Sequence, residues 1–458
     1  MPSLSSGYNI MNTALQGFQT ALDVTGNNIA NVNTAGYTRE TVNFGESDPT
    51  TFYGTSPYQI GSGVTIQSIS QIRSVLLDSS MNNAQSGLGQ YQQLANSLSS
   101  VQGLFPEPNS GGISDALSGF FNAFSSLAAS PSSASAQLAV QQAASTLTDR
   151  VQSTYAGLQQ QAEQTSSQMT STFNQIDQLT SSIASLNTQI ATQTAEGGSP
   201  NSLLDTRAQD LQQLSGLVDI QTSTNPNGSV NVYTNGLNLV GVNGATKFPQ
   251  TNTPGTLTFT SGSTSVSIQG GALAGLAQAA SKISSYEGQL DTLANNLTTQ
   301  VNAVYSTGKT AKGATGQDFF QASNPPGGAA GFQLTAAIAA NSGAILSGTS
   351  GNAGDGAMAQ SIANLNTTSI SALGSQSFST YYTNFIGGVG TDVQNATNSS
   401  STQTAVVSQI QAQQQSISGV NIDEEMTNML QYQHGYESAA KALSVIDTST
   451  EDLIQSIQ

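Results

Sequence analysis

Apolar residues near both ends of the chain recur at alternating steps of three and four positions, the pattern of helices that pack along a narrow seam. Thr25 is the one polar residue in the series near the start of the chain. Neither helix can bury its seam alone, so we expect the two ends to pack together or against other subunits. The seam residues are Leu4, Tyr8, Met11, Leu15, Phe18, Leu22, Ile29 and Val32 near the start, and Ile422, Met426, Met429, Tyr436, Ala440, Leu443 and Ile457 near the end.

The middle of the chain changes from helical to strand periodicity and back. Helical spacing predicts helices from about 75 to 104, from 113 to 127, over most of 131–200, and from 201 to 214. Alternating apolar and polar residues between 218 and 268 predict short strands, with turns at 225–228 and 235–236. Helix returns from about 272 to 304 and again from about 356 to the end. The first helix should stop in the asparagine-rich stretch that begins at Asn27.

These segments predict an α+β fold, in the form of an elongated rod of several domains with the termini together. Residues 1–40 and 420–458 would form a coiled-coil inner domain, followed by an extended linker at 41–70. A domain of long helices would combine 71–215 with 272–310 and 356–419. A small outer β domain would span 216–271, and 311–355 is a Gly- and Ala-rich insert without a structural prediction.

The composition excludes several classes of partner. The net charge is −17, and the nine basic residues form no cluster, which disfavours nucleic acid and anionic membranes. No apolar run is as long as a membrane span. Charged residues make up only 8% of the chain, against ~25% in ordinary globular proteins. A polar surface with few charges contacts neighbouring subunits without the cost of burying charge.

Candidate catalytic groups are few. Cysteine is absent, and His434, the only histidine, lies on the apolar ladder near the end. The densest acidic group is Asp423, Glu424 and Glu425, which follows Asn421 where a helix should begin. We interpret Asn421 as the N-cap with Glu424 as its reciprocal carboxylate, and the acids as partners of the helix dipole rather than metal ligands. We therefore predict no catalytic, cofactor-binding or metal-binding residues.

Two sequence motifs resemble the axial proteins of the bacterial flagellum, the family of rod, hook and hook-associated proteins. The first is NNIANVNTAGY at 27–37, and the second is SGVNIDEE at 418–425. The wording of the second motif, the run from 103 to 131 and the LLDTR segment at 203–207 favour the hook-associated protein 1 branch. The motif residues are Asn27, Asn28, Asn31, Asn33, Gly36, Tyr37, Val420, Asn421, Asp423, Glu424 and Glu425.

This resemblance implies a structural subunit at the junction between hook and filament. It implies self-association in a ring, contacts with hook protein and hook-associated protein 3, and a flagellar export chaperone. It also implies an extracellular location reached by flagellar type III export, without a cleaved signal peptide; the first basic residue of this chain is Arg39. The alternatives are a hook or rod subunit and, from a different class, a secreted carbohydrate-active or adhesive β protein.

Overall fold

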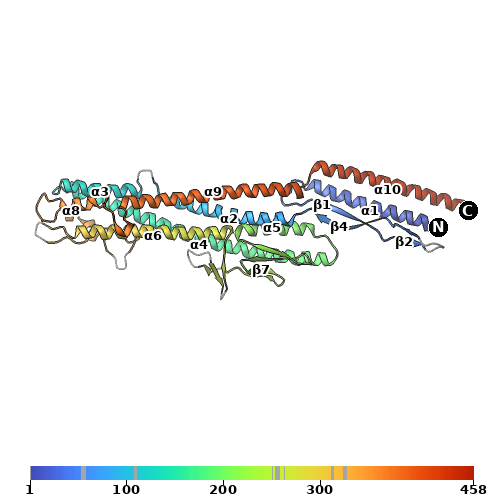
Figure 1. Cartoon of the computed structure of the whole chain (residues 1–458), viewed down its shortest axis with the longest axis horizontal. Helices are drawn as coiled ribbons and strands as arrows, with labels where there is room; N and C mark the ends of the chain where they lie inside the picture. The colour runs from blue at the N-terminus through green and yellow to red at the C-terminus, as the bar shows by residue number, and fades with distance from the viewer. Residues whose placement is uncertain are drawn as a thin grey trace. The chain divides into compact units, whose positions relative to one another are not determined.

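The computed structural model describes residues 2–52, 58–107, 111–249, 251–252, 258–261, 264–310, 314–322 and 327–457. Long helices and small antiparallel sheets make up the chain (Figure 1), which confirms the predicted α+β class. The chain divides into two compact units. Unit 1 comprises Met1–Ser86, Ile176–Phe248 and Thr404–Gln458, and unit 2 comprises Gly87–Gln175 and Pro249–Gln403. No helix among the described residues is long and apolar enough to cross a membrane.

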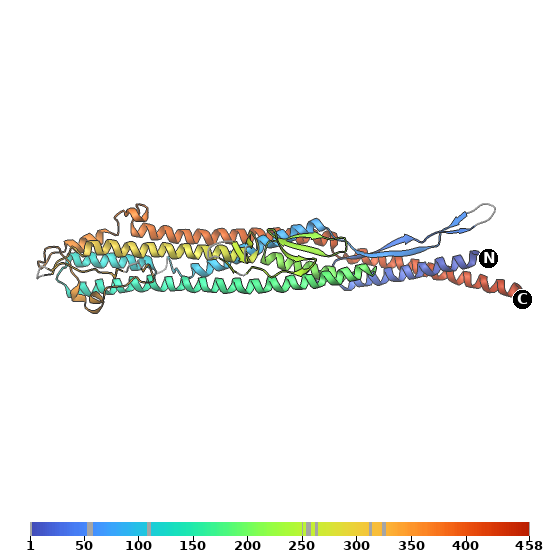
Figure 2. The ribbon, with the colours of Figure 1, turned by 90° about the horizontal axis from the view of Figure 1, so that it is seen from below.

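The two terminal helices pair in unit 1. Helices α1 (Pro2–Ala30) and α10 (Ile422–Ile457) lie side by side (Figures 1 and 2). They run antiparallel, because Gly7 lies opposite Ile446 and Gly435 lies opposite Phe18. A Cβ at Gly435 would lie 2.7 Å from Phe18 Cζ, so the phenyl ring occupies the space that this glycine leaves open. The absence of a side chain at Gly435 therefore allows the two helices to approach closely.

Residues 41–70, expected as an extended linker, contain two antiparallel strand pairs. Strand β1 (Glu40–Glu46) pairs with β4 (Val64–Gln71), and β2 (Thr50–Phe52) pairs with β3 (Tyr58–Ile60). The β1–β4 pair packs on α1, where Phe44 and Val64 face Gly17. Val42 of β1 is buried with Ala21 of α1. Helix α1 is thus covered by α10 along one side and by these strands along another.

A small sheet is attached to helices of unit 1. It consists of β5 (Gln221–Thr224), β6 (Val230–Thr234), β7 (Leu237–Gly241) and β8 (Gly244–Ala245), in sequence order. Asn235 and Gly236 both have positive φ, 41° and 86°, in the predicted Asn-Gly turn. Asn187 of α4 (Ala134–Ala195) donates to Val230 O at 2.7 Å and accepts from Val230 N at 3.0 Å. Arg207 of α5 (Asn201–Leu217) donates to Gly228 O at 2.7 Å, so both helices hold the sheet.

Unit 2 contains the larger hydrophobic core. Phe120 of α3 (Ile113–Ala129) packs against Phe319 and Phe320, and Phe124 packs against Phe319, with ring centroids 5.4–6.0 Å apart. The elements that lie wholly within this unit are α3 (Ile113–Ala129), β9 (Thr251–Asn252), β10 (Thr258–Ser261), β11 (Thr264–Ser267), α6 (Gly271–Tyr305), α7 (Ala336–Ala340), η1 (Ser342–Ala344), α8 (Ala357–Asn364) and η2 (Ser371–Leu373).

The units divide the chain differently from the domains expected above. The division falls inside the long helices α2 (Val75–Gln102), α4 and α9 (Phe378–Ser418). Residues 216–271, expected as one β domain, hold two separate sheets: β5–β8 in unit 1 and β9–β11 in unit 2. The insert at 311–355 contributes the buried Phe319, Phe320 and Phe332 to the core of unit 2.

Candidate functional site

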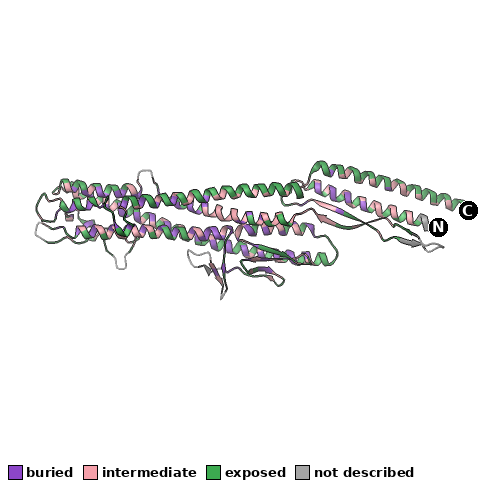
Figure 3. Ribbon diagram, viewed as in Figure 1, coloured by how far each residue is buried: buried purple, intermediate pink, exposed green. Residues whose placement is uncertain are grey.

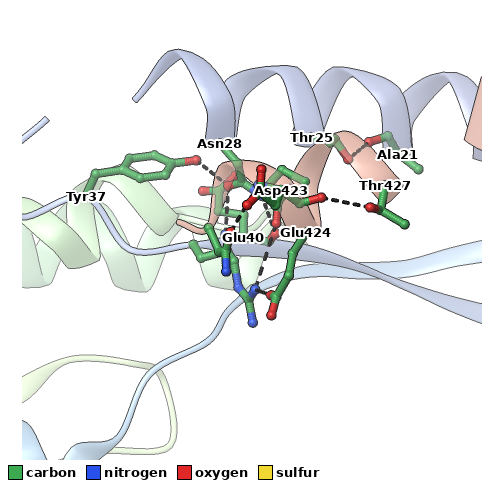
Figure 4. A network of polar contacts seen from close by, with 11 residues as sticks. Ala21, Thr25, Asn28, Tyr37, Glu40, Asp423, Glu424 and Thr427 are labelled. Carbon is green, nitrogen blue, oxygen red and sulfur yellow. Dashed lines mark hydrogen bonds and ion pairs between the residues drawn. The ribbon is translucent and has the colours of Figure 1, made fainter. Parts of the chain in front are cut away.

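Asn28 lies at the centre of a polar network that joins the two ends of the chain (Figure 4). Asn28 is 1% exposed. Both the nitrogen and the oxygen of its side-chain amide form two hydrogen bonds each. Its Nδ2 donates to Glu40 O at 2.8 Å and to Glu425 Oε2 at 3.0 Å. Its Oδ1 accepts from Tyr37 Oη at 2.8 Å and from Glu40 N at 3.0 Å. One asparagine side chain therefore links α1, the start of β1 and the start of α10.

Arg39 supplies a second link to α10. Its Nη1 lies 2.6 Å from Glu424 Oε2 and 4.0 Å from Glu425 Oε1. Its backbone N–H donates to Ser418 O at 2.9 Å, at the end of α9. Asn421 caps α10 as predicted, because its Oδ1 accepts from Asp423 N at 3.0 Å. Glu424, expected to complete this cap, accepts from Arg39 instead.

Asp205 connects this junction to α5. Its carboxylate accepts from Thr38 Oγ1 at 2.7 Å and from Thr38 N at 3.1 Å. Arg73 Nη1 lies 3.8 Å away, and Arg73 also pairs with Asp78 on the first turn of α2. Gln209 of α5 donates to Ala35 O at 2.9 Å, next to Gly36, whose φ is +79°. The LLDTR segment thus positions the chain that follows α1.

Burial shifts the titration of three groups in this network. It raises the pKa of the Tyr37 phenol well above its ordinary value, and the carboxylates of Glu40, Asp205 and Glu425 raise it further. The hydroxyl therefore remains protonated and donates to Asn28. Burial also raises the pKa of Glu40 and of Asp205, although the hydrogen bonds from Thr38 and the charge of Arg73 act in the opposite direction on Asp205.

Replacing Asp205 tests the attachment of this junction. We expect Asp205→Ala to lower the free energy of unfolding of unit 1 by roughly 1–3 kcal/mol, because the buried N–H and hydroxyl of Thr38 lose their acceptor. Asp205→Asn keeps an acceptor and should cost less. Since the folded pKa is raised, the contribution from protonation of Asp205 is present at low pH and lost as pH rises through that pKa. Urea unfolding between acid and neutral pH should show a smaller slope in Asp205→Asn than in the parent, because the raised pKa of Glu40 contributes a slope to both.

The other motif residues are mostly near the surface. Asn27 donates to Tyr37 Oη at 3.4 Å, and Asn31 donates to Asn27 O at 3.0 Å just beyond the end of α1. Asn33 is exposed and Val420 is half-buried. Asp423 is exposed at the start of α10, and its backbone oxygen accepts from Thr427 Oγ1. Among the described residues, no group of three His, Cys, Asp or Glu side chains is arranged to hold a metal ion.

The predicted seam residues fall on more than one face. On α1, Met11, Leu15, Phe18, Leu22, Ile29 and the following Val32 are half-buried, and Tyr8 is 44% exposed. The most buried positions of α1 are instead Gly17, Ala21, Val24, Thr25 and Asn28. The side chains of Leu4 and Ile457 lie outside the described part. The inner aromatic contacts of Phe44 with Phe18 and Tyr432, each at 6.4 Å between ring centroids, were not predicted.

Helix α10 carries two apolar faces. Tyr432, Gly435, Ala439, Leu443 and Ile446 are half-buried or buried, whereas other large apolar residues of the same helix are exposed. Figure 3 shows half-buried and exposed residues along α10. The predicted seam mixes the two: Met429, Ala440 and Leu443 are half-buried, while three of its residues belong to the outer set. That outer apolar face consists of Ile422, Met426, Leu430, Tyr436, Val445 and Ile454, which are 37–63% exposed.

Three family models match the chain. Residues 98–320 match the flagellar hook-associated protein FlgK helical domain. Residues 411–456 match the flagellar basal body rod FlgEFG protein C-terminal region, and residues 9–38 match the flagella basal body rod protein family. The last two matches cover most of α10 and α1, and they include the partners in the Asn28 network on both helices.

Relatives extend the similarity over the whole chain. Flagellar hook-associated protein 1 of Bacillus subtilis is 29% identical over 99% of this chain and 98% of its own length. The protein of the same name from Escherichia coli is 24% identical over 97% of this chain and 99% of its length. The structure of the flagellar hook junction protein FlgK from Burkholderia pseudomallei has the same fold, with a TM-score of 0.65, 18% identity, and coverage of 74% of this chain and all of that one. Along nearly its whole length, the chain is therefore similar to proteins named flagellar hook-associated protein 1.

Proposed function

We infer that the chain is a structural subunit of the bacterial flagellum at the junction between hook and filament, and that it is required for filament assembly. The observation that carries this inference is the similarity along the whole chain to proteins named flagellar hook-associated protein 1. The paired termini support it, because α10 retains an outer apolar face that another subunit can cover. A hook subunit is supported less well, since the similarity to the hook protein of Borreliella burgdorferi covers 16% of this chain.

The same proposal includes finer features. Copies of the chain form a ring on the last layer of hook protein and support hook-associated protein 3 and the filament. The chain leaves the cell through the flagellar export channel after binding a cytoplasmic chaperone, and it performs no catalysis. The low content of charge and the lack of cysteine are compatible with passage as an unfolded chain.

Electron microscopy of cells that lack the gene tests the function. We expect hooks without filaments, and recovery of filaments when the parent gene is restored. Normal filaments in the deletion strain would contradict the junction role. Absence of hooks would indicate a hook or rod subunit instead.

The contacts between subunits should depend little on salt. The outer face of α10 is apolar, and α1 carries Asp23 as its single charged residue. Because salt screens charges and not apolar contacts, incorporation of purified protein onto bare hooks should change little between low and high salt. The measurement is the number of bare hooks that regain filaments on cells that do not secrete their own copy of this protein. A steep decrease with salt would point to ion pairs between subunits.

A further inference from the structure

A pocket of about 200 Å³ lies beside the Asn28 network, between α1, β1 and α10 in unit 1. Arg39 lines the pocket, and its Nε is buried without a hydrogen-bond partner among the described residues. Asn428 of α10 also lines it, and within the described part its side chain makes no hydrogen bond. A buried N–H that lacks an acceptor costs roughly 1–3 kcal/mol, so an acceptor that reaches Arg39 is stabilised there.

The charges of the pocket select the kind of acceptor. Glu40, Glu424 and Glu425 line it together with the single guanidinium of Arg39. An anion would meet three carboxylates and one cation, and is disfavoured. A primary amide suits both kinds of group, because its oxygen accepts from Nε–H and its NH₂ donates to a carboxylate. The pocket is therefore suited to an asparagine or glutamine side chain.

Helix α1 presents such side chains on its outer surface. Asn9, Asn12, Gln16 and Gln19 are all exposed and are spaced by three, four and three residues, so they form one row along the helix. This amide row lies on the side of α1 away from the buried Gly17 and Ala21. Helix α1 contains no lysine or arginine that could fill an acidic pocket as a cation.

We propose that the amide row of α1 in one copy of the chain docks against α10 of a second copy and inserts an amide into the Arg39 pocket. This proposal rests on the proposed function, which brings copies together in a ring. It assigns a direction to the contact: α1 of one subunit meets the pocket of the next. The contact is heterologous, so it can close a ring.

Disulfide crosslinking tests the proposal, because the parent chain has no cysteine. Four double variants combine Asn428→Cys with Asn9→Cys, Asn12→Cys, Gln16→Cys or Gln19→Cys. A disulfide forms only when the two Cβ atoms approach to about 3.5–4.5 Å. At least one pair should convert the monomer in assembled flagella into a ladder of dimers and larger multiples. The same protein collected as a secreted monomer should give no ladder.

The matched control keeps the cysteine on α1 and moves the cysteine on α10 from Asn428 to the exposed His434, which lies outside the pocket. If Asn428→Cys lowers assembly, Thr41→Cys on the β1 wall of the pocket replaces it. Flagella with normal filaments and no ladder from any pair at either pocket position would overturn the proposal. Equal ladders from His434→Cys, or crosslinks to a different protein by mass spectrometry, would also overturn it. Failure of the proposed function would be seen separately, as absence of the cysteine-free chain from the junction.

Discussion

Replacing Asn28 by alanine is expected to separate the two terminal helices and to leave cells with bare hooks. The substitution removes the bonds to Glu425 and Tyr37 and to both backbone groups of Glu40. Because these groups are buried or half-buried, the loss should lower the stability of the terminal helix pair by about 3 kcal/mol or more. Hydrogen exchange should become faster in α1 and α10, while the buried core of unit 2 should keep its protection.

Asn33→Ala is the matched control for this prediction. Asn33 belongs to the same sequence motif and has the same side chain, but it is exposed. Its replacement should change stability by less than about 0.5 kcal/mol and leave filaments normal. Equal effects of the two substitutions would mean that the motif acts through its composition and not through the network around Asn28.

A carboxylate at Met426 is expected to abolish assembly without unfolding the subunit. Met426 is 53% exposed, so Met426→Asp places the new charge in water in the isolated chain. If a neighbouring subunit covers the outer apolar face, the same charge is buried without a partner and costs several kcal/mol per contact. Circular dichroism and secretion should remain near the parent level, while electron microscopy should show hooks that lack filaments.

Gln431→Asp is a control on the same helix. Gln431 is exposed and lies about 140° around α10 from Met426, at 3.6 residues per turn. The added charge is identical, but it lies on a different side of α10 from the face that Met426 presents, so filaments should form. Normal motility with Met426→Asp would show that this face is not covered in the flagellum.

The sequence predicts the helices and hairpins well because their signals are local. The predicted helix over 113–127 corresponds to α3, and the Asn-Gly turn at 235–236 has the positive φ values that its residues favour. The asparagine-rich stretch was expected to end the first helix, and α1 does end inside it, at Ala30. Asn28 is accommodated inside the helix because its amide bonds to groups outside α1 instead of competing for the helical backbone.

Contacts between distant segments could not be predicted in this way. Thr38 and Asp205 are 167 positions apart, and no periodicity connects them. The pattern on α10 predicts an apolar ladder, but it does not distinguish the inner face from the outer one, because both carry large apolar side chains. The role of Gly435 could not be predicted either, because it depends on the ring of Phe18 on the other helix.

Because α1 pairs with α10, the folding of α1 depends on the presence of the last residues of the chain. The first helix that the ribosome makes obtains its partner only when the last residues have been made. Every chain that ends before Ile422 lacks α10, and with it the acceptors that Glu424 and Glu425 provide for Arg39 and Asn28. We therefore expect a truncated product to have an α1 without its partner helix, and this defect, at the opposite end from the missing residues, to prevent its incorporation into the flagellum.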